Sequence, residues 1–367
     1  MNKLVIGNLL HRPLRTLISV FAIAIEVVMI LCIVAVMLGQ VNGARNMNIG
    51  IGADMIVQPP SASNLSGVSG APVPAKVADV LRKLPHVAVV APTIVNLTMG
   101  SSLETIWGID YNSFNALRPF TFVAGTAFQG PNDVIVDDFF AKSDHGYHVG
   151  DTITILKHDF RICGIVEHGK GGRKFLEIRT LGAMMGNPDN ASLFYIKSDD
   201  SNDQELIRRE IVAVPGLSDY QVKTMEEQLS QLTPEHLPAF TIALNVVISI
   251  AVIIGFLVIF QSMYTAVMER TREIGVLKSL GASKGYIVNV VLRESALISI
   301  CGILLGMGFT QLIHIWMAYR FPTLPFFTTT DWWIRGAAIA LVGGILGAVY
   351  PALKAARKDP IDALAYE

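Results

Sequence analysis

The sequence predicts a membrane α-helical protein with four transmembrane helices and a large extracytoplasmic α+β domain between helices 1 and 2. Of its 367 residues, 51% are hydrophobic and only 16% are charged, whereas soluble domains carry about 25% charged residues. Four apolar stretches hold a single charged side chain, Glu26, and they lie at 17–38, 237–268, 295–313 and 336–353. A polar segment, 41–239, separates the first stretch from the second. These observations exclude a disordered chain and argue against an ordinary soluble domain.

Each apolar stretch is long enough for one membrane crossing, because about 20 residues at 1.5 Å each span the hydrocarbon core. The predicted helices are 17–40, 240–268, 295–316 and 334–353, with cytoplasmic segments at 1–16, 269–294 and 354–367 and a short outer loop at 317–333. The first apolar run has 22 residues, which exceeds the 7–15 of a typical signal peptide. We therefore expect an uncleaved helix.

The distribution of charge predicts the orientation. Residues 41–239 contain 22 acidic and 16 basic side chains, and the remainder contains 8 acidic and 13 basic ones. Most of those 13 lie near the N-terminus, between helices 2 and 3, and in the tail. Because short loops rich in Lys and Arg stay in the cytoplasm, both termini and the 269–294 loop are expected inside. The net charge of the chain, −1, gives no field for nucleic acid.

The polar segment has the pattern of an α+β domain. Its first part predicts strands at 54–58, 86–98 and 102–109 with a helix at 75–84, and its last part predicts strand, helix and strand at 192–196, 202–212 and 220–223. Between them, about 111–190, lies a β-rich insertion that includes a strand at 134–136 and a hairpin within 149–169. This order fits one α+β domain interrupted by a small β-rich subdomain.

Two patterns in this domain resemble chemical sites. Gly164 to Lys170 spell G-x-x-x-x-G-K, but Gly171 follows where a phosphate loop needs Ser or Thr for magnesium. The histidines at 145, 148, 158 and 168 lack the ligand spacing of a zinc site. The sequence also lacks the G-x-S-x-G motif of a hydrolase. We therefore expect no catalytic residue, metal or cofactor in this chain.

The segment between helices 2 and 3 predicts a short amphipathic helix. Charged residues from Glu269 to Glu273 can pair at i,i+3 and i,i+4, and apolar residues follow at helical spacing. Gly281 suits the C′ position that ends a helix, and Ser283 can cap the next one. A helix that only closes a loop and lies among lipid headgroups is the alternative interpretation.

This segment closely resembles the signature of FtsX/MacB-type ABC transporter permeases, in the run ERTREIGVLKSLGAS and the following LRES. Three other segments agree with that family: NLLHRPLRTLISV at 8–20, VGDTITI with GIVEHG in the outer hairpin, and YPALKAARKDPIDAL at 350–364. The four motifs occur in the family's order and cover the whole chain. The chain is therefore identified as a member of this four-helix mechanotransmission family, whose relatives include macrolide-export, glycolipid-export and lipoprotein-releasing permeases.

The resemblance implies a multi-pass protein of the bacterial inner membrane that works with a separate cytoplasmic ATPase, which would bind the ATP and magnesium. A second permease chain would complete a homodimer or heterodimer, membrane lipids would surround it, and the outer domain would be ferredoxin-like with a β-rich subdomain. The residues implied to contact the ATPase are Glu269, Arg270, Arg272, Glu273, Gly275, Leu277, Lys278, Leu280, Gly281 and Ala282.

Three functions fit the resemblance. The first is export of a small or lipid-like molecule or a peptide, with a periplasmic adaptor as a possible further partner. The second is extraction of lipoproteins, and the third is signalling across the membrane to a cell-wall hydrolase. The large outer domain favours the first two.

Glu26 departs from the family pattern. Family members usually carry small residues four apart in helix 1 for close packing, whereas this chain has Ala22 and then Glu26. A charged carboxylate near the centre of a membrane helix costs about 2.5–3.5 kcal/mol. We expect a protonated Glu26 that faces the dimer axis and is hydrogen-bonded to Asn245, Gln261, His314 or the other chain's Glu26. A proton or substrate contact at Glu26 is the alternative.

Overall fold

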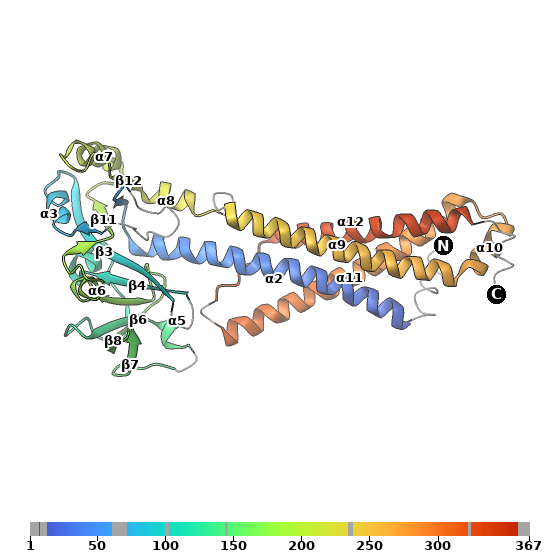
Figure 1. The fold of residues 1–367 in the computed structure, drawn as a ribbon, viewed down its shortest axis with the longest axis horizontal. Coiled ribbons are helices and arrows are strands. Elements are labelled where there is room, and N and C mark those ends of the chain that lie inside the picture. Colours follow the sequence, from blue (N-terminus) through green and yellow to red (C-terminus); the bar gives the residue numbers. More distant parts are fainter. Residues whose placement is uncertain are drawn as a thin grey trace. The chain divides into compact units, whose positions relative to one another are not determined.

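The computed structural model describes residues 7, 13–60, 72–99, 103–143, 146–233, 238–321 and 324–358. The family-like opening segment is thus described from Pro13 onward and the C-terminal one as far as Lys358. The chain divides into two compact units (Figure 1). We call residues 1–39, 238–320 and 324–367 the helix bundle, and residues 40–237 with 321–323 the inserted domain.

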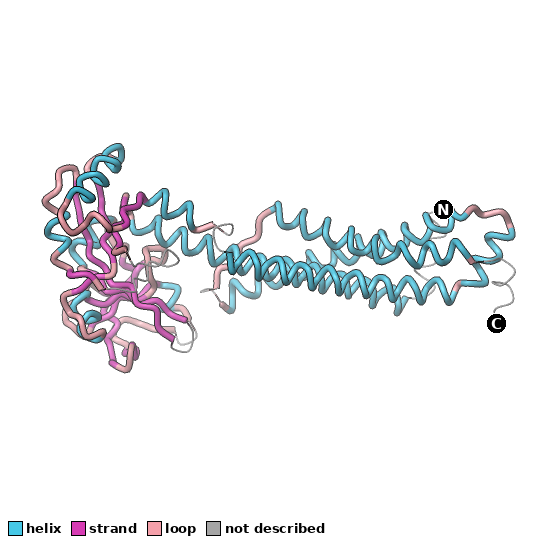
Figure 2. The backbone as a smooth tube through the Cα atoms, turned by 45° about the horizontal axis from the view of Figure 1, so that its top comes forward, coloured by secondary structure: helices cyan, strands magenta, loops and turns pink. Residues whose placement is uncertain are grey.

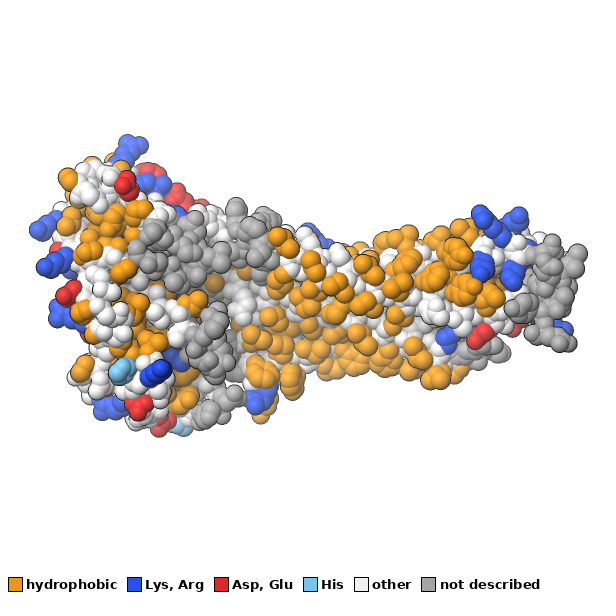
Figure 3. Space-filling model, in the orientation of Figure 1, with side chains coloured by type: hydrophobic (Ala, Val, Ile, Leu, Met, Phe, Trp, Pro, Cys, Tyr) orange, Lys and Arg blue, Asp and Glu red, His pale blue; other side chains and the backbone are white. Residues whose placement is uncertain are grey.

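Four long helices make up the helix bundle, and all are long and apolar enough to cross a membrane. They are α2 (Pro13–Ile51), α9 (Pro238–Glu269), α11 (Lys284–Arg320) and α12 (Thr330–Arg357), with the short α10 (Thr271–Ser279) between α9 and α11 (Figure 2). Apolar side chains cover the visible face of the long helices, and a group of Lys and Arg marks the end that carries α10 (Figure 3). The predicted fold class, four membrane helices with an α+β domain between the first and second, is confirmed.

The helices exceed the predicted membrane spans at several ends. Helix α2 continues from residue 40 to Ile51, and its last part belongs to the inserted domain. Helix α11 begins at Lys284, so it takes up the second half of the predicted 269–294 loop. Apolar pattern and charge mark where a helix can enter the membrane, and they do not mark where its hydrogen bonding stops.

Close packing inside the bundle uses glycines on α11 against α2. A Cβ atom built on Gly302 would stand 2.7 Å from the Cβ of Ile23, and one on Gly306 would stand 2.8 Å from the carbonyl oxygen of Ala24. Neither position has room for a side chain. The small residues four apart that bring membrane helices together are therefore on the third helix of this chain, facing the first.

The inserted domain is built on one continuous sheet. Among the described residues it has ten strands in the order β12-β1-β11-β3-β4-β9-β6-β8-β5, with β7 paired to β8. The strands from the two ends of the domain are β1 (Met55–Gln58), β3 (Val87–Met99), β4 (Leu103–Ile109), β11 (Leu193–Ser198) and β12 (Gln221–Thr224). The strands of the insertion are β5 (Phe122–Gly125), β6 (Asp133–Asp137), β7 (Thr152–Ile155), β8 (His158–Val166) and β9 (Lys174–Glu177).

The two halves of the sheet join where β4 and β9 pair in parallel, with Ile106 opposite Lys174. Strand β9 is not among the strands expected from the sequence. The β7–β8 pair is antiparallel and lies within the predicted hairpin. A separate small ladder pairs β2 (Val73–Pro74) with β10 (Asn190–Ala191).

Helices cover both faces of this sheet. One core contains residues of α3 (Val77–Leu81), α6 (Ile178–Met184) and α7 (Gln204–Ala213) together with Met55 and Val57 of β1. The other contains α4 (Tyr111–Leu117) and the end of α2 together with Ile56. The alternation of side chains along β1 thus supplies both cores. The remaining short helices are α5 (Asp138–Ala141), α8 (Met225–Gln231) and the 3₁₀ turn Ser201–Asp203.

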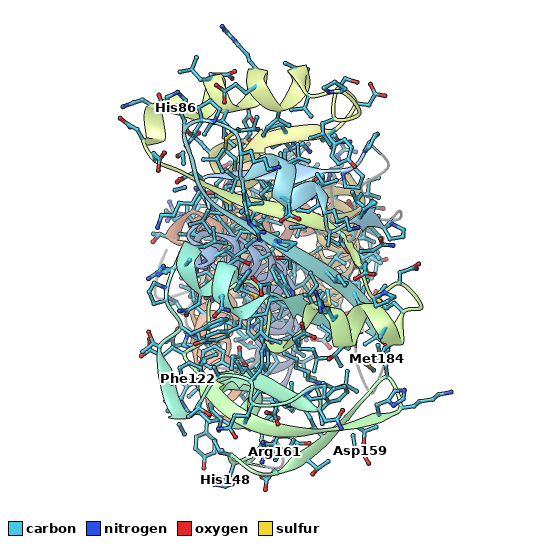
Figure 4. The ribbon with its side chains drawn as sticks, turned by 90° about the vertical axis from the view of Figure 1, so that its left-hand side faces the viewer. His86, Phe122, His148, Asp159, Arg161 and Met184 are labelled. Atoms are coloured by element: carbon cyan, nitrogen blue, oxygen red, sulfur yellow. The ribbon has the colours of Figure 1, made fainter. Side chains whose placement is uncertain are left out.

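Figure 4 shows His86 and the labelled residues of β8 at opposite ends of the inserted domain. His86 lies beside α7, where its Nδ1 is 3.3 Å from Asp203 Oδ2. At the opposite end, Arg161 and Asp159 mark β8 and His148 precedes β7. The histidines 148, 158 and 168 join no group of three or more His, Cys, Asp or Glu side chains that could hold a metal, in the part of the chain that is described; His145 lies outside that part.

Candidate functional site

Helix α10 is set apart from its neighbours by a break and a turn. Arg270 leaves helical geometry, with φ −105° and ψ 18°, and separates α9 from α10. At the other end Gly281 has φ +96°, its N–H donates to Lys278 O and the N–H of Ala282 donates to Leu277 O, both at 3.0 Å. This pair of bonds is the Schellman motif. The Tyr286 N–H donates to Ser283 Oγ at 3.2 Å, so Gly281 and Ser283 have the roles that their positions predict.

One face of α10 points away from the helix bundle. Its exposed side chains recur at helical spacing and are Arg272, Glu273, Val276, Ser279 and Leu280. Leu280 is 79% exposed and Val276 is 43% exposed. Two exposed apolar side chains beside the charged Arg272 and Glu273 form a surface that suits a protein partner.

The other face of α10 is held by the bundle. Thr271 and Gly275 are buried, and Ile274 and Leu277 pack against the bundle core. Lys278 Nζ donates to the carbonyl oxygen of Ala356 at 3.0 Å and to that of Lys358. Because these carbonyls belong to the end of α12, Lys278 ties α10 to the last turn of that helix.

Four charged side chains connect α2, α9 and α11 at this point, and we call them the ionic cluster: Arg15, Glu269, Arg270 and Glu294. Arg270 Nη1 is 3.3 and 3.1 Å from the two carboxylate oxygens of Glu294. Arg15 Nη1 lies 3.1 Å from Glu269 Oε2, and its Nη2 lies 3.7 Å from Glu294 Oε1. Glu294 is only 3% exposed, so its charge depends on these partners.

The structure divides the set of residues predicted to contact an ATPase. Outward-facing members are Arg272, Glu273, Leu280 and Gly281, while Glu269, Arg270, Gly275, Leu277, Lys278 and Ala282 contact the bundle itself or are buried in it. The prediction did not include Val276 and Ser279 on the outward face, or Arg15 and Glu294 in the ionic cluster. A signal for Glu294 was available, since Ile287, Val291, Glu294 and Ile298 follow a helical stripe whose other members are apolar.

Glu26 does not face a dimer axis, and this expectation is corrected. The side chain is buried inside the chain's own bundle, where the residue is 4% exposed. It lies against Gly255 of α9, and a Cβ atom built there would overlap its carboxyl group and stand 2.7 Å from Oε1. Among the described residues Oε1 has no hydrogen-bond partner, and no bond joins Glu26 to Asn245, Gln261 or His314. Glu26 therefore fills the space that a glycine leaves on the neighbouring helix.

The loop that resembles a phosphate loop is closed to ligands. Lys170 is 7% exposed, its Nζ lies 3.8 Å from the centroid of the Phe120 ring, and it donates to the carbonyls of Phe114 and Arg118. Burial, and then the nearby Arg118, lower the pKa of Lys170 to about 7. A lysine held in this way cannot reach a phosphate group, which agrees with the missing Ser or Thr.

Two family models match the chain. The MacB-like periplasmic core domain matches residues 16–214, more than half of the 367 residues, and the FtsX-like permease C-terminal domain matches residues 245–360. The first match begins within α2 and ends after α7, and the second covers α10, α11, α12 and most of α9.

Named proteins with similar sequences come from several bacteria. The macrolide export ATP-binding/permease protein MacB of Shewanella sp. W3-18-1 is 26% identical over 97% of this chain and 59% of its own length, so the chain spans about three fifths of that relative. The uncharacterized ABC transporter permease YknZ of Bacillus subtilis is 27% identical over 72% of this chain and 70% of its own. The putative hemin transport system permease protein HrtB of Staphylococcus haemolyticus is 21% identical over 70% of each chain.

The chain also aligns with a solved structure. The periplasmic region of MacB from Actinobacillus actinomycetemcomitans aligns with 52% of this chain and 94% of its own, with 14% identity and a TM-score of 0.38.

Proposed function

Because the chain belongs to the family of FtsX/MacB-type ABC transporter permeases, we propose that it couples ATP hydrolysis by a separate cytoplasmic ATPase to movement of its inserted domain. In this proposal the movement drives export of a small or lipid-like molecule or a peptide. Two relatives support this class of substrate by name, one a macrolide export protein and the other a putative hemin transport permease.

The observation that carries the proposal is the division of α10 into two faces. The outward face offers Val276 and Leu280 beside the charged Arg272 and Glu273. The inward face is joined to α12 through Lys278, and the neighbouring Arg270 is joined to α11 through Glu294. A partner that pushes on the outward face would therefore act on both helices.

The orientation belongs to the same proposal. The α10 end of the bundle would be cytoplasmic and the inserted domain would lie outside the inner membrane, because the basic residues gather around α10 and in the tail. A second permease chain would complete the transporter, and a periplasmic adaptor would be needed where the substrate crosses an outer membrane.

Docking of the ATPase is tested with Leu280→Asp. This substitution places a charge on the outward face and leaves the packed residues Ile274 and Leu277 unchanged. We expect the full chain to insert normally, to lose co-purification with its ATPase and to lose ATP-dependent transport. Glu273→Lys should act in the same direction, and Glu226→Lys, an exposed charge reversal in the inserted domain, is the control. Normal co-purification of both α10 variants would contradict the docking assignment.

Orientation is tested by thiol labelling in a chain without its three cysteines. His148→Cys, whose native side chain is 85% exposed, should react with an impermeant reagent in cells whose outer membrane alone has been opened. Lys284→Cys, next to α10, should react only after the inner membrane is disrupted. The reverse pattern would exclude ATPase contact at α10.

A further inference from the structure

A strip of aromatic side chains lines a shallow groove on the surface of α9 and α12. The groove is formed by Phe256, Phe260, Gln261, Tyr264 and Tyr350. Phe256, Phe260 and Tyr264 follow one another at four-residue spacing, with ring centroids 6.2 and 6.0 Å apart. Tyr350 of α12 packs beside Phe260 at 5.8 Å. These rings cover each other along the helix axis and leave one flank open.

A lysine stands at one end of this strip. Lys354 Nζ donates to the hydroxyl oxygen of Tyr264 at 2.7 Å and lies 4.5 Å from the centroid of that ring. An ammonium group has three donors, and within the described ranges Tyr264 Oη is its one acceptor and no carboxylate pairs with it. The cation can therefore accept an anionic ligand from outside the chain.

The depth of these residues matches the layers of a bilayer leaflet. Lys354 is three residues before the end of α12 and Tyr264 is five before the end of α9, which places them about 5–8 Å from the helix ends. Phe256 lies about 20 Å from the end of α9 by the same rise per residue. The lysine is thus at headgroup level and the rings extend into the hydrocarbon region, which is about 30 Å thick in total.

Gln261 is a second polar side chain beside these rings, and it suggests a bound lipid in addition to a lysine that only extends to the membrane interface. Its side chain is exposed among the rings and, in the described part of the chain, its amide has no hydrogen bond. An amide that faces pure hydrocarbon is costly. The ester carbonyls of a phospholipid lie just below its phosphate, so they can accept from Gln261 while the phosphate binds Lys354.

From this arrangement we infer that the surface of α9 and α12 beside Lys354 is a binding site for an anionic phospholipid. The phosphate accepts from Lys354 and from the hydroxyl of Tyr264, and one acyl chain lies along Phe260 and Phe256. A second copy of this chain fits less well, because it has few acids to offer. Of the described acids in the bundle, Glu26 and Glu294 are buried, Glu269 pairs with Arg15, Asp331 pairs with Arg335, and Glu273 lies on α10.

The test is native mass spectrometry of the full purified chain with dioleoyl-phosphatidylglycerol or dioleoyl-phosphatidylcholine. Wild-type protein should keep phosphatidylglycerol under activation that removes phosphatidylcholine. Lys354→Gln should weaken apparent binding of phosphatidylglycerol about fivefold, as expected for one lysine near an anionic surface, and should leave phosphatidylcholine unchanged. Phe260→Ala should weaken retention of both lipids. The matched control is Arg335→Gln at the other end of α12, whose guanidinium is already paired with Asp331 at 2.9 Å.

Two results would overturn the inference. The first is wild-type retention of phosphatidylglycerol in both Lys354→Gln and Tyr264→Phe, the second of which removes only a hydroxyl group. The second is unchanged lipid retention combined with dissociation of a dimer, which would assign this face to a second copy of the chain. Equal thermal unfolding of the variants and wild type excludes a folding defect.

Discussion

Glu294→Gln is expected to destabilise the helix bundle strongly although it changes only one atom of the side chain. The carboxylate of Glu294 is almost fully buried and faces Arg270 and Arg15. Removal of its charge breaks the ion pair with Arg270, whose side chain is 11% exposed. Arg15 keeps its contact with Glu269 at 3.1 Å.

The magnitude follows from the cost of breaking a buried ion pair. Breaking a buried ion pair on one side typically costs about 3–5 kcal/mol. The free energy of unfolding should therefore fall by about that amount in Glu294→Gln. The double variant Arg270→Met/Glu294→Met should lie within about 1 kcal/mol of wild type, because apolar residues of similar volume often replace a buried ion pair without loss.

The assay is denaturant unfolding of the detergent-solubilised chain, followed by circular dichroism. It compares wild type, Glu294→Gln, the single variants Arg270→Met and Glu294→Met, and the double variant. Glu273→Gln, on the exposed face of α10, is the control and should change the free energy of unfolding by less than about 0.5 kcal/mol. Additive losses in the double variant, or a Glu294→Gln protein as stable as wild type, would refute the cluster as a stabilising unit.

Three further outcomes are expected. Gly255→Ala should lower the free energy of unfolding by about 1–3 kcal/mol through overpacking against Glu26. Adding Glu26→Ala to the same chain should recover most of this loss. Equal stability of Gly255→Ala and wild type in thermal unfolding would count against the contact. Lys170 has a pKa of about 7 in the folded state and an ordinary value of 10.5. Because the unfolded state binds more protons between these two values, the free energy of unfolding should rise with pH by up to about 1.4 kcal/mol per pH unit. Lys170→Met should flatten this rise in unfolding curves measured from pH 7 to 9. Burial raises the pKa of Asp137 from 3.8 to about 6, so the folded state holds the extra proton in that window and stability should fall as pH rises through it; Asp137→Asn keeps the bond from the Phe140 N–H and should unfold at pH 7 no earlier than wild type.

The residue pattern was sufficient to predict those elements that depend only on neighbouring residues. Four stretches with one charged residue predict four membrane helices, since no other structure buries so much apolar chain at that length. The position of Gly281 predicts the end of α10, because glycine adopts the left-handed backbone conformation of a helix end without steric strain.

Elements that depend on contacts between distant parts of the chain could not be predicted from the sequence. Strand β9 has four residues, two of them charged, and no local pattern marks it as central in a sheet. It pairs with β4, which lies far from it in the sequence, and Lys174 rests over the ring of Phe140 at 4.3 Å. The direction of Arg270 is a similar case, because a charged residue among surface charges gives no sign that it turns inward to Glu294.

Helix α2 contributes residues both to the ionic cluster and to the inserted domain. Near its start Arg15 belongs to the ionic cluster beside α10. Near its end, within the inserted domain, the N–H of Gly171 donates to Met47 O at 2.9 Å, and Gly50 lies against the backbone of Gly169 without room for a side chain. The helix is continuous between these points. One unbroken helix therefore carries both Arg15 of the ionic cluster and the residues that contact the 169–171 loop.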